Sequence, residues 1–200
     1  MRHAQTPTTG KTLPGRAPGL HLADRGREQA ADVADRIARL PRVAAVYASP
    51  LERARETAEP IAAACRLRVT CDDGLLECDC GEWTGASLRE LRRRAEWKTI
   101  QRYPSGFRFP GGESFTEMQA RVTAALGRLV AAHPGQTVVA VSHADPIKVA
   151  LAHALGTHLD LFQRIAVFPA SVSAVAYRAD GPAVLSVNTT RGDLAPLAAQ

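Results

Sequence analysis

Two histidines lie far apart in the sequence, and each stands where it could meet a ligand. His3 follows Arg2 at the start of the chain, and His143 follows the β-branched run 137–141. An imidazole can attack phosphorus or bind a phosphate oxygen, so two histidines that meet at one phosphate would indicate phosphoryl transfer. Each also has a simpler interpretation. A histidine after a strand can be purely structural, and a free X-X-His terminus can chelate copper or nickel.

The segment around His143 predicts where this side chain lies. The run 137–141 is typical of a buried strand, and Asp145-Pro146 opens a helix with apolar residues at helical spacing that stops at Gly156. His143 is therefore expected at the carboxyl end of a strand and just before a helix N-terminus. In an open α/β sheet ligands bind at this edge, and a helix N-terminus offers N–H groups to an anion.

Arg53 belongs to a second strand-to-helix unit. Residues 43–48 read as a short strand. Ser49 then fits the N-cap of a helix, with Pro50 as its first residue and Glu52 completing a capping box. This places Arg53 in the first turn of the helix, again at the carboxyl end of a strand. An arginine that makes only a solvated surface contact is the alternative.

Glu77 is a candidate for proton transfer. It follows a Leu-Leu pair and precedes a glycine-containing turn with Trp83. A carboxyl held at a pocket wall would have its pKa raised by burial, which suits a general acid or base. Asp79 and Glu82 lie in the same stretch, so chemistry alone does not choose among the three acids.

Five motifs together resemble the histidine phosphatase superfamily, in its phosphoglycerate-mutase-like branch. The resemblance covers essentially the whole chain, with the motifs in the right order. It implies an α/β fold, a three-layer α/β/α sandwich with a mostly parallel sheet. The motifs are Arg2-His3-Ala4-Gln5-Thr6; Ser49 to Arg53 with Glu56-Thr57-Ala58; Leu76-Glu77 with Gly81-x-Trp83-x-Gly85; Pro110-Gly111-Gly112-Glu113-Ser114; and Val141-Ser142-His143-Ala144-Asp145 with Ile147-Lys148.

The resemblance implies a role for each catalytic residue. His3 would be the nucleophile that takes the phosphoryl group, and Glu77 would give a proton to the leaving oxygen. Arg2, Arg53 and His143 would bind the phosphoryl oxygens. Guanidinium groups suit this task, because phosphoryl transfer depends on positioning and charge stabilisation. A cationic neighbourhood also favours the neutral imidazole that can attack. No metal and no cofactor is required.

The chain departs from the usual family pattern near its start. Ala4-Gln5 stands where the pattern has glycine and an acid, and Thr9 stands where it commonly has a phosphate-binding asparagine. Gly15 and Arg16 lie in a loop that resembles the substrate-covering segment of the family. The predicted substrate-binding set is Arg2, Thr9, Gly15, Arg16, Arg53, His143 and Ala144.

The resemblance also predicts a hydrophobic β-strand before Arg2-His3, at the position where Met1 stands. Deleting an interior strand would remove about four buried side chains, each contributing roughly 1.5–3 kcal/mol. We therefore expect the 200-residue chain to lack the first strand of the fold.

Composition suits one domain over residues 1–200. Hydrophobic residues make up 46% of the chain, no apolar run approaches a membrane span, and the start does not read as a signal peptide. These features predict a cytoplasmic protein with no membrane partner. The four cysteines lack the paired C-x2-C spacing of a zinc site, so reduced thiols are expected rather than a metal. They are Cys65, Cys71, Cys78 and Cys80.

The net charge of +5 raises the question of nucleic acid. The basic excess falls mainly on one predicted helix that Ser87 and Glu90 would open as a capping box. Few aromatic residues accompany it, so a solvated helix face explains it better than an RNA-binding surface. Residues 86–112 are predicted to form a basic lid that could face an anionic substrate. The basic residues are Arg89, Arg92, Arg93, Arg94, Lys98 and Arg102.

The remaining elements follow from periodicity. Helices are predicted over 24–40, with Asp24 as N-cap, over 50–65 and over 114–133. A further strand is predicted at 67–71. The runs 172–177 and 183–187 alternate and turn at Asp180-Gly181, which is typical of a hairpin.

Three functions stay open at this stage. The chain lacks the Arg-Arg-Ser-Tyr-type insertion of true phosphoglycerate mutases, and a phosphatase needs only one phosphate site and an accessible water. This favours a phosphatase acting on a small phosphomonoester. A phosphomutase is the runner-up, and a truncated, non-catalytic binder of phosphorylated ligands is a third possibility. A metal- or RNA-binding basic domain is a poorer alternative, and a homodimer is left open.

Overall fold

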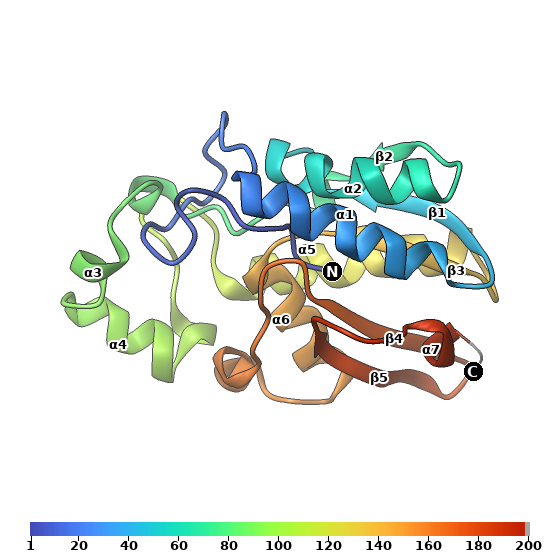
Figure 1. Ribbon diagram of the computed structural model, residues 1–200. Coiled ribbons are helices and arrows are strands. Elements are labelled where there is room, and N and C mark those ends of the chain that lie inside the picture. Colours follow the sequence, from blue (N-terminus) through green and yellow to red (C-terminus); the bar gives the residue numbers. More distant parts are fainter. Residues whose placement is uncertain (199–200) are drawn as a thin grey trace.

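A parallel sheet of three strands runs through the middle of the molecule (Figure 1). The computed structural model describes residues 1–198. The strands are Val43–Ala48 (β1), Val69–Cys71 (β2) and Thr137–Val141 (β3), in the order β2-β1-β3. Branched residues favour this extended form, and the most buried positions are at the carboxyl end of each longer strand. Those ends are where the predicted site residues follow.

Helices cover both faces of this sheet. Asp24–Ala38 (α1) and Glu52–Ala64 (α2) pack on one face, and Phe115–Ala132 (α5) and Ala144–Ala154 (α6) lie on the other (Figure 1). The predicted three-layer α/β/α architecture is confirmed. The residues that α1 and α2 bury against the sheet recur at three- and four-residue spacing, which places them on one helix face. They include Val33, Ala34, Ile37, Ala54, Ala58 and Ile61.

An antiparallel hairpin follows α6. Its strands are Val172–Arg178 (β4) and Gly181–Thr189 (β5), and they pair with each other. The predicted hairpin is confirmed, but its turn lies at Ala179-Asp180, one residue earlier than predicted, because Gly181 already belongs to β5.

Residues 1–3 connect the hairpin to the parallel sheet. Arg2 bridges to Ser142 in parallel orientation, and the N–H of His3 donates to the carbonyl of Ser142 at 2.9 Å. On the other side, the N–H of Arg2 donates to Ser171 O at 3.1 Å and that of Ala170 to His3 O at 3.2 Å. These residues therefore occupy the position of a very short strand between β3 and β4.

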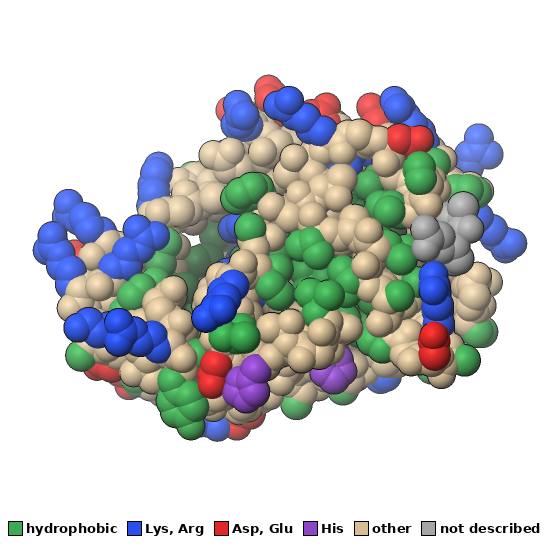
Figure 2. Space-filling model, turned by 90° about the horizontal axis from the view of Figure 1, so that it is seen from below, with side chains coloured by type: hydrophobic (Ala, Val, Ile, Leu, Met, Phe, Trp, Pro, Cys, Tyr) green, Lys and Arg blue, Asp and Glu red, His purple; other side chains and the backbone are tan. Residues whose placement is uncertain are grey.

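A basic lobe projects from one end of the molecule. It holds Leu88–Leu91 (α3) and Ala95–Arg102 (α4), and Lys and Arg side chains gather on it (Figures 1 and 2). The prediction of one basic helix is wrong. Leu91 and Ile100 are nine residues apart, so a continuous helix would point them in opposite directions. The break between α3 and α4 lets both reach the same apolar cluster.

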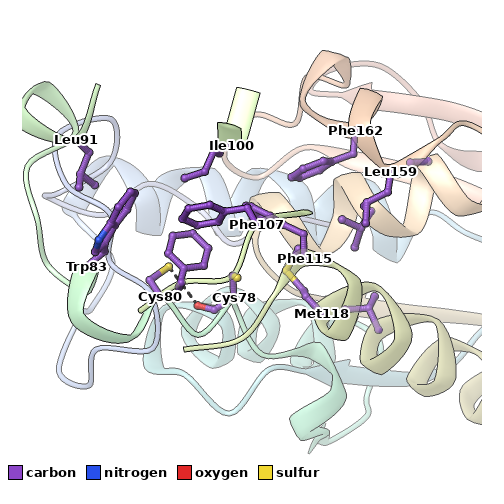
Figure 3. Packing of buried hydrophobic residues seen from close by; sticks show 14 residues of the cluster. Cys78, Cys80, Trp83, Leu91, Ile100, Phe107, Phe115, Met118, Leu159 and Phe162 are labelled. Carbon is purple, nitrogen blue, oxygen red and sulfur yellow. Dashed lines mark hydrogen bonds between the residues drawn. The ribbon is translucent and has the colours of Figure 1, made fainter. Parts of the chain in front are cut away.

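This apolar cluster anchors the lobe to the main body. Aromatic rings from the lobe and its flanks pack around Phe107, whose ring centroid lies 5.6 Å from that of Trp83 and 6.2 Å from that of Phe115, both pairs being tilted (Figure 3). Cys78 and Cys80 lie buried in the same cluster. All four cysteines are free thiols. The segment that carries Glu77 is thus packed against the lobe.

Helix beginnings differ in detail from the predictions. Asp24 is the first residue of α1 and not its cap, because Ala23 occupies the N-cap position. The predicted capping box of Ser49 is wrong, since α2 begins only at Glu52 and has Leu51 as N-cap. Ser87 caps α3 in position but makes no side-chain cap bond, so that predicted box is also wrong.

A cavity of about 590 Å³ lies between β3 and β4, beside residues 1–3. Both strands turn an edge toward it, because β3 otherwise pairs with β1 and β4 with β5. Apolar side chains line it from the helices, among them Ile37, Leu126, Leu129, Ile147 and Ala150. This is the position at which the sequence predicts a further strand.

Two other features concern residues 1–198 as described. None of their helices is both long and apolar enough to span a membrane. No group of three or more His, Cys, Asp or Glu side chains within them is arranged to hold a metal ion.

Candidate active site

The two histidines singled out from the sequence meet at the carboxyl edge of the sheet. Their ring centroids are 5.1 Å apart and the rings meet edge to face. His3 is held by the strand-like pairing of residues 1–3, and His143 is the N-cap residue of α6. Both side chains are buried. The structure thus brings together residues separated by most of the chain.

The imidazole of His3 is held in its neutral form. Its Nδ1 lies 2.8 Å from the carbonyl oxygen of Ala4. A carbonyl only accepts, so Nδ1 carries the hydrogen and Nε2 keeps the lone pair. Burial, together with Arg53 and Arg2, lowers the pKa of His3 to about 3. The imidazole is therefore neutral throughout the physiological pH range, as an attack on phosphorus requires.

Arg53 is a completely buried cation in the first turn of α2. Its Nη2 donates to the carbonyl of Gly15 at 2.8 Å, whereas its Nε and Nη1 are buried and have no partner among the described residues. Gly15 suits this role because its φ is +50° and a Cβ there would meet Thr84 Oγ1 at 2.8 Å. Unpaired buried donors on a cation are costly, so they point to an anion as their partner.

Arg2 and His143 present further donors. Arg2 Nη1 is fixed by the carbonyl of Val167 at 2.7 Å, and its buried Nε has no described partner. His143 Nε2 lies 2.8 Å from Ser49 Oγ, and its Nδ1 is buried without a described partner. If the Ser49 hydroxyl donates to Nε2, Nδ1 carries the hydrogen and becomes a fourth free donor. The other three free donors are Nε of Arg2 and Nε and Nη1 of Arg53.

Glu77 is half-buried, in a stretch where the sequence predicted a carboxyl at a pocket wall. It lies in the irregular segment between two 3-10 turns, Asp73–Leu75 (η1) and Gly81–Trp83 (η2). Burial, and then the charge of Asp145, raise the pKa of Glu77 to about 7, although Cys78 N–H, Arg53 and Arg2 act in the opposite direction. One carboxylate oxygen accepts from the N–H of Cys78 at 2.9 Å. A carboxyl with this pKa can give and take a proton near neutral pH.

The remaining predicted ligands have varied surroundings. Thr9 Oγ1 accepts from the N–H of Thr6 at 2.9 Å, so it closes a turn in the loop. Ala144 is the first residue of α6, where backbone N–H groups have no carbonyl within the helix. Arg16 donates to the carbonyl of Glu77 and to Glu113, and therefore already has protein partners.

Sequence reasoning missed several supporting residues. Ser49 orients His143 instead of capping a helix, and Thr57 ties Arg53 to the histidine segment. Thr57 Oγ1 donates to Arg53 O at 2.7 Å and accepts from Ala4 N–H at 3.0 Å. Both lie inside motifs quoted for the resemblance, but their partners are distant in sequence, and only the fold reveals them.

The whole pattern matches a known family model. Residues 1–190 match the model of the histidine phosphatase superfamily, branch 1. The chain belongs to this superfamily. Several relatives of this chain carry an activity in their names. A phosphoserine phosphatase of Hydrogenobacter thermophilus is 32% identical over 189 residues, covering 88% of this chain and 85% of its own.

Two further comparisons extend the family evidence. A bifunctional protein of Mycobacterium tuberculosis is 37% identical over 194 residues, covering 95% of this chain. This chain spans only 53% of that protein, about half the length of the first curated relatives it matches. Among solved structures, phosphoserine phosphatase from Entamoeba histolytica in complex with 3-phosphoglyceric acid has a TM-score of 0.85 and 26% identity, covering 95% of each chain.

Proposed function

We propose that this chain hydrolyses small phosphomonoesters through a phosphohistidine on His3. The observation that carries the proposal is the set of buried donors without protein partners around a neutral imidazole. They belong to Arg2, Arg53 and His143. Such preorganised donors stabilise the charge that develops on a transferring phosphoryl group.

The first step transfers the phosphoryl group to the enzyme. His3 Nε2 attacks phosphorus while the P–O bond to the alcohol breaks. Glu77, protonated below its raised pKa, gives its proton to the leaving oxygen. Arg2, Arg53 and His143 hold the phosphoryl oxygens. The Ala144 N–H at the start of α6 adds a further donor.

The second step regenerates the enzyme. A water molecule attacks the phosphohistidine, the P–N bond breaks, and inorganic phosphate leaves. Glu77, now a carboxylate, takes a proton from the attacking water and returns to its starting form. In this proposal Gly15 acts through its carbonyl on Arg53, and Thr9 shapes the loop beside the site. Arg16 is treated separately below.

Relatives named as phosphatases and relatives named as phosphoglycerate mutases both match this chain, and the missing Arg-Arg-Ser-Tyr-type insertion favours hydrolysis over transfer between positions. Two proteins named phosphoserine phosphatase match this chain, one by sequence and one by structure. A phosphomutase would return the phosphoryl group to a second hydroxyl instead of to water. We therefore expect inorganic phosphate as the main product, and isomerised phosphoester would favour the mutase instead.

The proposal includes the setting of the protein. We propose a cytoplasmic enzyme that needs no metal or nucleic acid. The exposed arginines of the lobe face solvent or an anionic substrate. Activity that persists after chelation and after nuclease treatment is the expected result. Retention on RNA that falls with salt would instead favour a nucleic-acid surface.

Trapping the intermediate tests the proposal. The protein is mixed briefly with a turned-over phosphomonoester labelled in its phosphoryl group and is quenched at alkaline pH. We expect label on His3 by peptide mapping, and neither label nor turnover in His3→Ala. Label on another residue, or turnover that survives in His3→Ala, would overturn the proposal. Binding of phosphoesters without turnover or label in the wild type would indicate a non-catalytic binder.

A further inference from the structure

The backbone around Glu77 is held by an arginine that the proposed mechanism does not use. Arg121, on α5, donates from Nη1 to the carbonyls of Gly74 and Leu76 at 2.9 and 3.0 Å. Its Nη2 donates to the carbonyl of Glu77 at 3.4 Å. One side chain thus contacts three carbonyls within four residues. These carbonyls belong to the irregular segment that carries the proposed general acid.

Glu113 completes the arrangement. It accepts from Arg121 Nη2 at 2.6 Å and from Arg121 Nε at 3.3 Å. The same carboxylate accepts from the N–H of Asp79 at 3.0 Å, on the other side of Glu77. Its side chain is only 14% exposed, so these bonds are largely shielded from water. Every N–H of the Arg121 guanidinium is consequently engaged, because the group has five donors and five acceptors surround it.

Arg16, from the loop near the start of the chain, contacts Glu77 and Glu113 as well. Its Nε donates to the carbonyl of Glu77 at 2.9 Å, and its Nη2 donates to Glu113 at 3.1 Å. The Glu77 carbonyl therefore accepts from two guanidinium groups that come from separate parts of the chain. Both groups are joined to each other through Glu113.

The segment needs such support because it has no regular structure. Residues 76–80 lie between η1 and η2, outside any helix or strand. The Glu77 carboxylate itself receives one bond, from its neighbour Cys78. Fixed carbonyls on both sides of Cα therefore set where the carboxyl group lies. A reacting group displaced by about 1 Å can lose roughly 10²-fold in rate.

We propose that Arg121, Glu113 and Arg16 form a positioning cluster that holds Glu77 at the proton-transfer position. This inference rests on the proposed function, in which Glu77 is the general acid. It assigns Arg16 to the support of Glu77, where the sequence suggested a substrate ligand. Arg121 also differs from Arg53 in its partners. The protein engages the donors of Arg121, whereas the free donors of Arg53 face the phosphate site.

The leaving group separates positioning from other roles. An ester with a good leaving group, such as 4-nitrophenyl phosphate, needs little protonation, whereas an alkyl phosphate needs it fully. Arg121→Met should lower kcat/KM, which reports the first step alone, by about 10²-fold on the alkyl phosphate and by less than about 5-fold on 4-nitrophenyl phosphate. Glu113→Gln should show the same selectivity with a smaller loss. The double variant Arg121→Met with Glu77→Gln should be no slower than Glu77→Gln alone.

Two variants keep the test decisive. Arg128→Met lies on the same helix and removes an exposed ion pair with Asp72, so kcat/KM on both esters should stay unchanged. Arg121→Lys keeps the charge but presents no planar fork, so it should fold and still lose part of the alkyl phosphate activity. It carries the test if Arg121→Met melts far below the wild type.

The possible outcomes separate a failure of this inference from a failure of the proposed function on which it rests. Equal losses of kcat/KM on both esters would show that the cluster binds substrate or only stabilises the fold, and would overturn the proposal. If Glu77→Gln is selective for alkyl phosphates and Arg121→Met is not, only the positioning role fails. If Glu77→Gln shows no selectivity while His3 is still labelled, the acid role of Glu77 fails. If the wild type carries no phosphoryl label on His3, the proposed function itself is refuted.

Discussion

Arg53, which is completely buried, and Arg121, which is half-buried, have different roles at one site. Nη2 of Arg53 donates to a protein carbonyl, whereas its Nε and Nη1 are left for a ligand. Arg121 has all of its donors engaged by carbonyl and carboxylate oxygens. The residue type is the same in both, so the partners of the donors decide the role of each side chain.

The pKa of Glu77 sets an expected pH dependence. Glu77 must be protonated to give its proton in the first step, and its pKa is about 7. We therefore expect kcat/KM on an alkyl phosphate to fall as the pH rises through about 7. His3 becomes protonated only near pH 3, so it should cause no loss between pH 4 and 7. Initial rates across this range measure the profile.

Glu77→Gln provides the control for that profile. The variant cannot titrate at this position, so its residual kcat/KM should lack the fall near pH 7. The substrate phosphate, whose second pKa is about 6, titrates in the same way with both proteins. Its effect therefore cancels in the ratio of the wild-type kcat/KM to the variant kcat/KM at each pH. An identical profile in the variant would remove Glu77 as the source of the alkaline decline.

The predictability of the site also differs residue by residue. His3, Arg53 and His143 could be placed because each lies next to a strand end or a helix start that local sequence reveals. Arg121 and Glu113 could not, since their partners are backbone carbonyls and an N–H that carry no side-chain signature. Arg16 was found, but its predicted role as a substrate ligand has no test in the geometry, which gives it Glu113 as a partner.

At the scale of elements, three segments carry the same Ser-x-x-Glu pattern and behave differently. Only Ser114 forms the capping box, with Glu117 at the start of α5. The Ser49 hydroxyl instead forms a hydrogen bond with His143, while Glu52 accepts from the N–H of Gly19. Ser87 pairs through its backbone with Thr12 in an isolated bridge. Tertiary partners therefore decide which pattern becomes a cap, and local sequence does not contain them.

Alanine at two of these serines should separate the two outcomes. Ser114→Ala removes a true cap and should destabilise the protein by about 1 kcal/mol, lowering Tm by roughly 2–4 °C with kcat unchanged. Ser49→Ala should lower kcat by about 10–10²-fold, because the His143 ring loses its fixed orientation. Thermal melts and steady-state rates measure both, with Ser87→Ala as the reference variant. Unchanged kcat in Ser49→Ala would contradict the role of its hydroxyl.

At the scale of the whole molecule, the general architecture follows from the sequence, but the join between its two sheets does not. Alternating and β-branched runs predicted β1, β3 and the hairpin. The contacts of residues 1–3 with Ser142 and Ser171 depend on chain segments that are far apart. The lobe was mispredicted as one helix because the shared burial of Leu91 and Ile100 is a tertiary requirement.

The cavity between β3 and β4 has a direct consequence for stability. The Met1 ammonium lies in it and donates to Ala140 O at 2.7 Å, and burial lowers its pKa from 8.0 to about 5. An amide N–H in this place would make the same bond at any pH. An extended segment here could also pair with the open edges of both strands and cover apolar side chains from α1, α5 and α6.

We therefore expect that adding five alternating Val, Leu and Ile residues before Met1 raises Tm by roughly 5–10 °C. About four buried side chains would contribute roughly 1.5–3 kcal/mol each, and ordering the added backbone would offset much of this gain. The same strand would fix Arg2 and His3 more firmly, so kcat should rise as well. Differential scanning calorimetry and steady-state rates compare this protein with the 200-residue chain and with an extension of five Gly and Ser residues. The polar extension replaces the terminal amine by an amide but cannot fill the cavity. Equal Tm and kcat in both extended proteins would show that the cavity does not accept a strand.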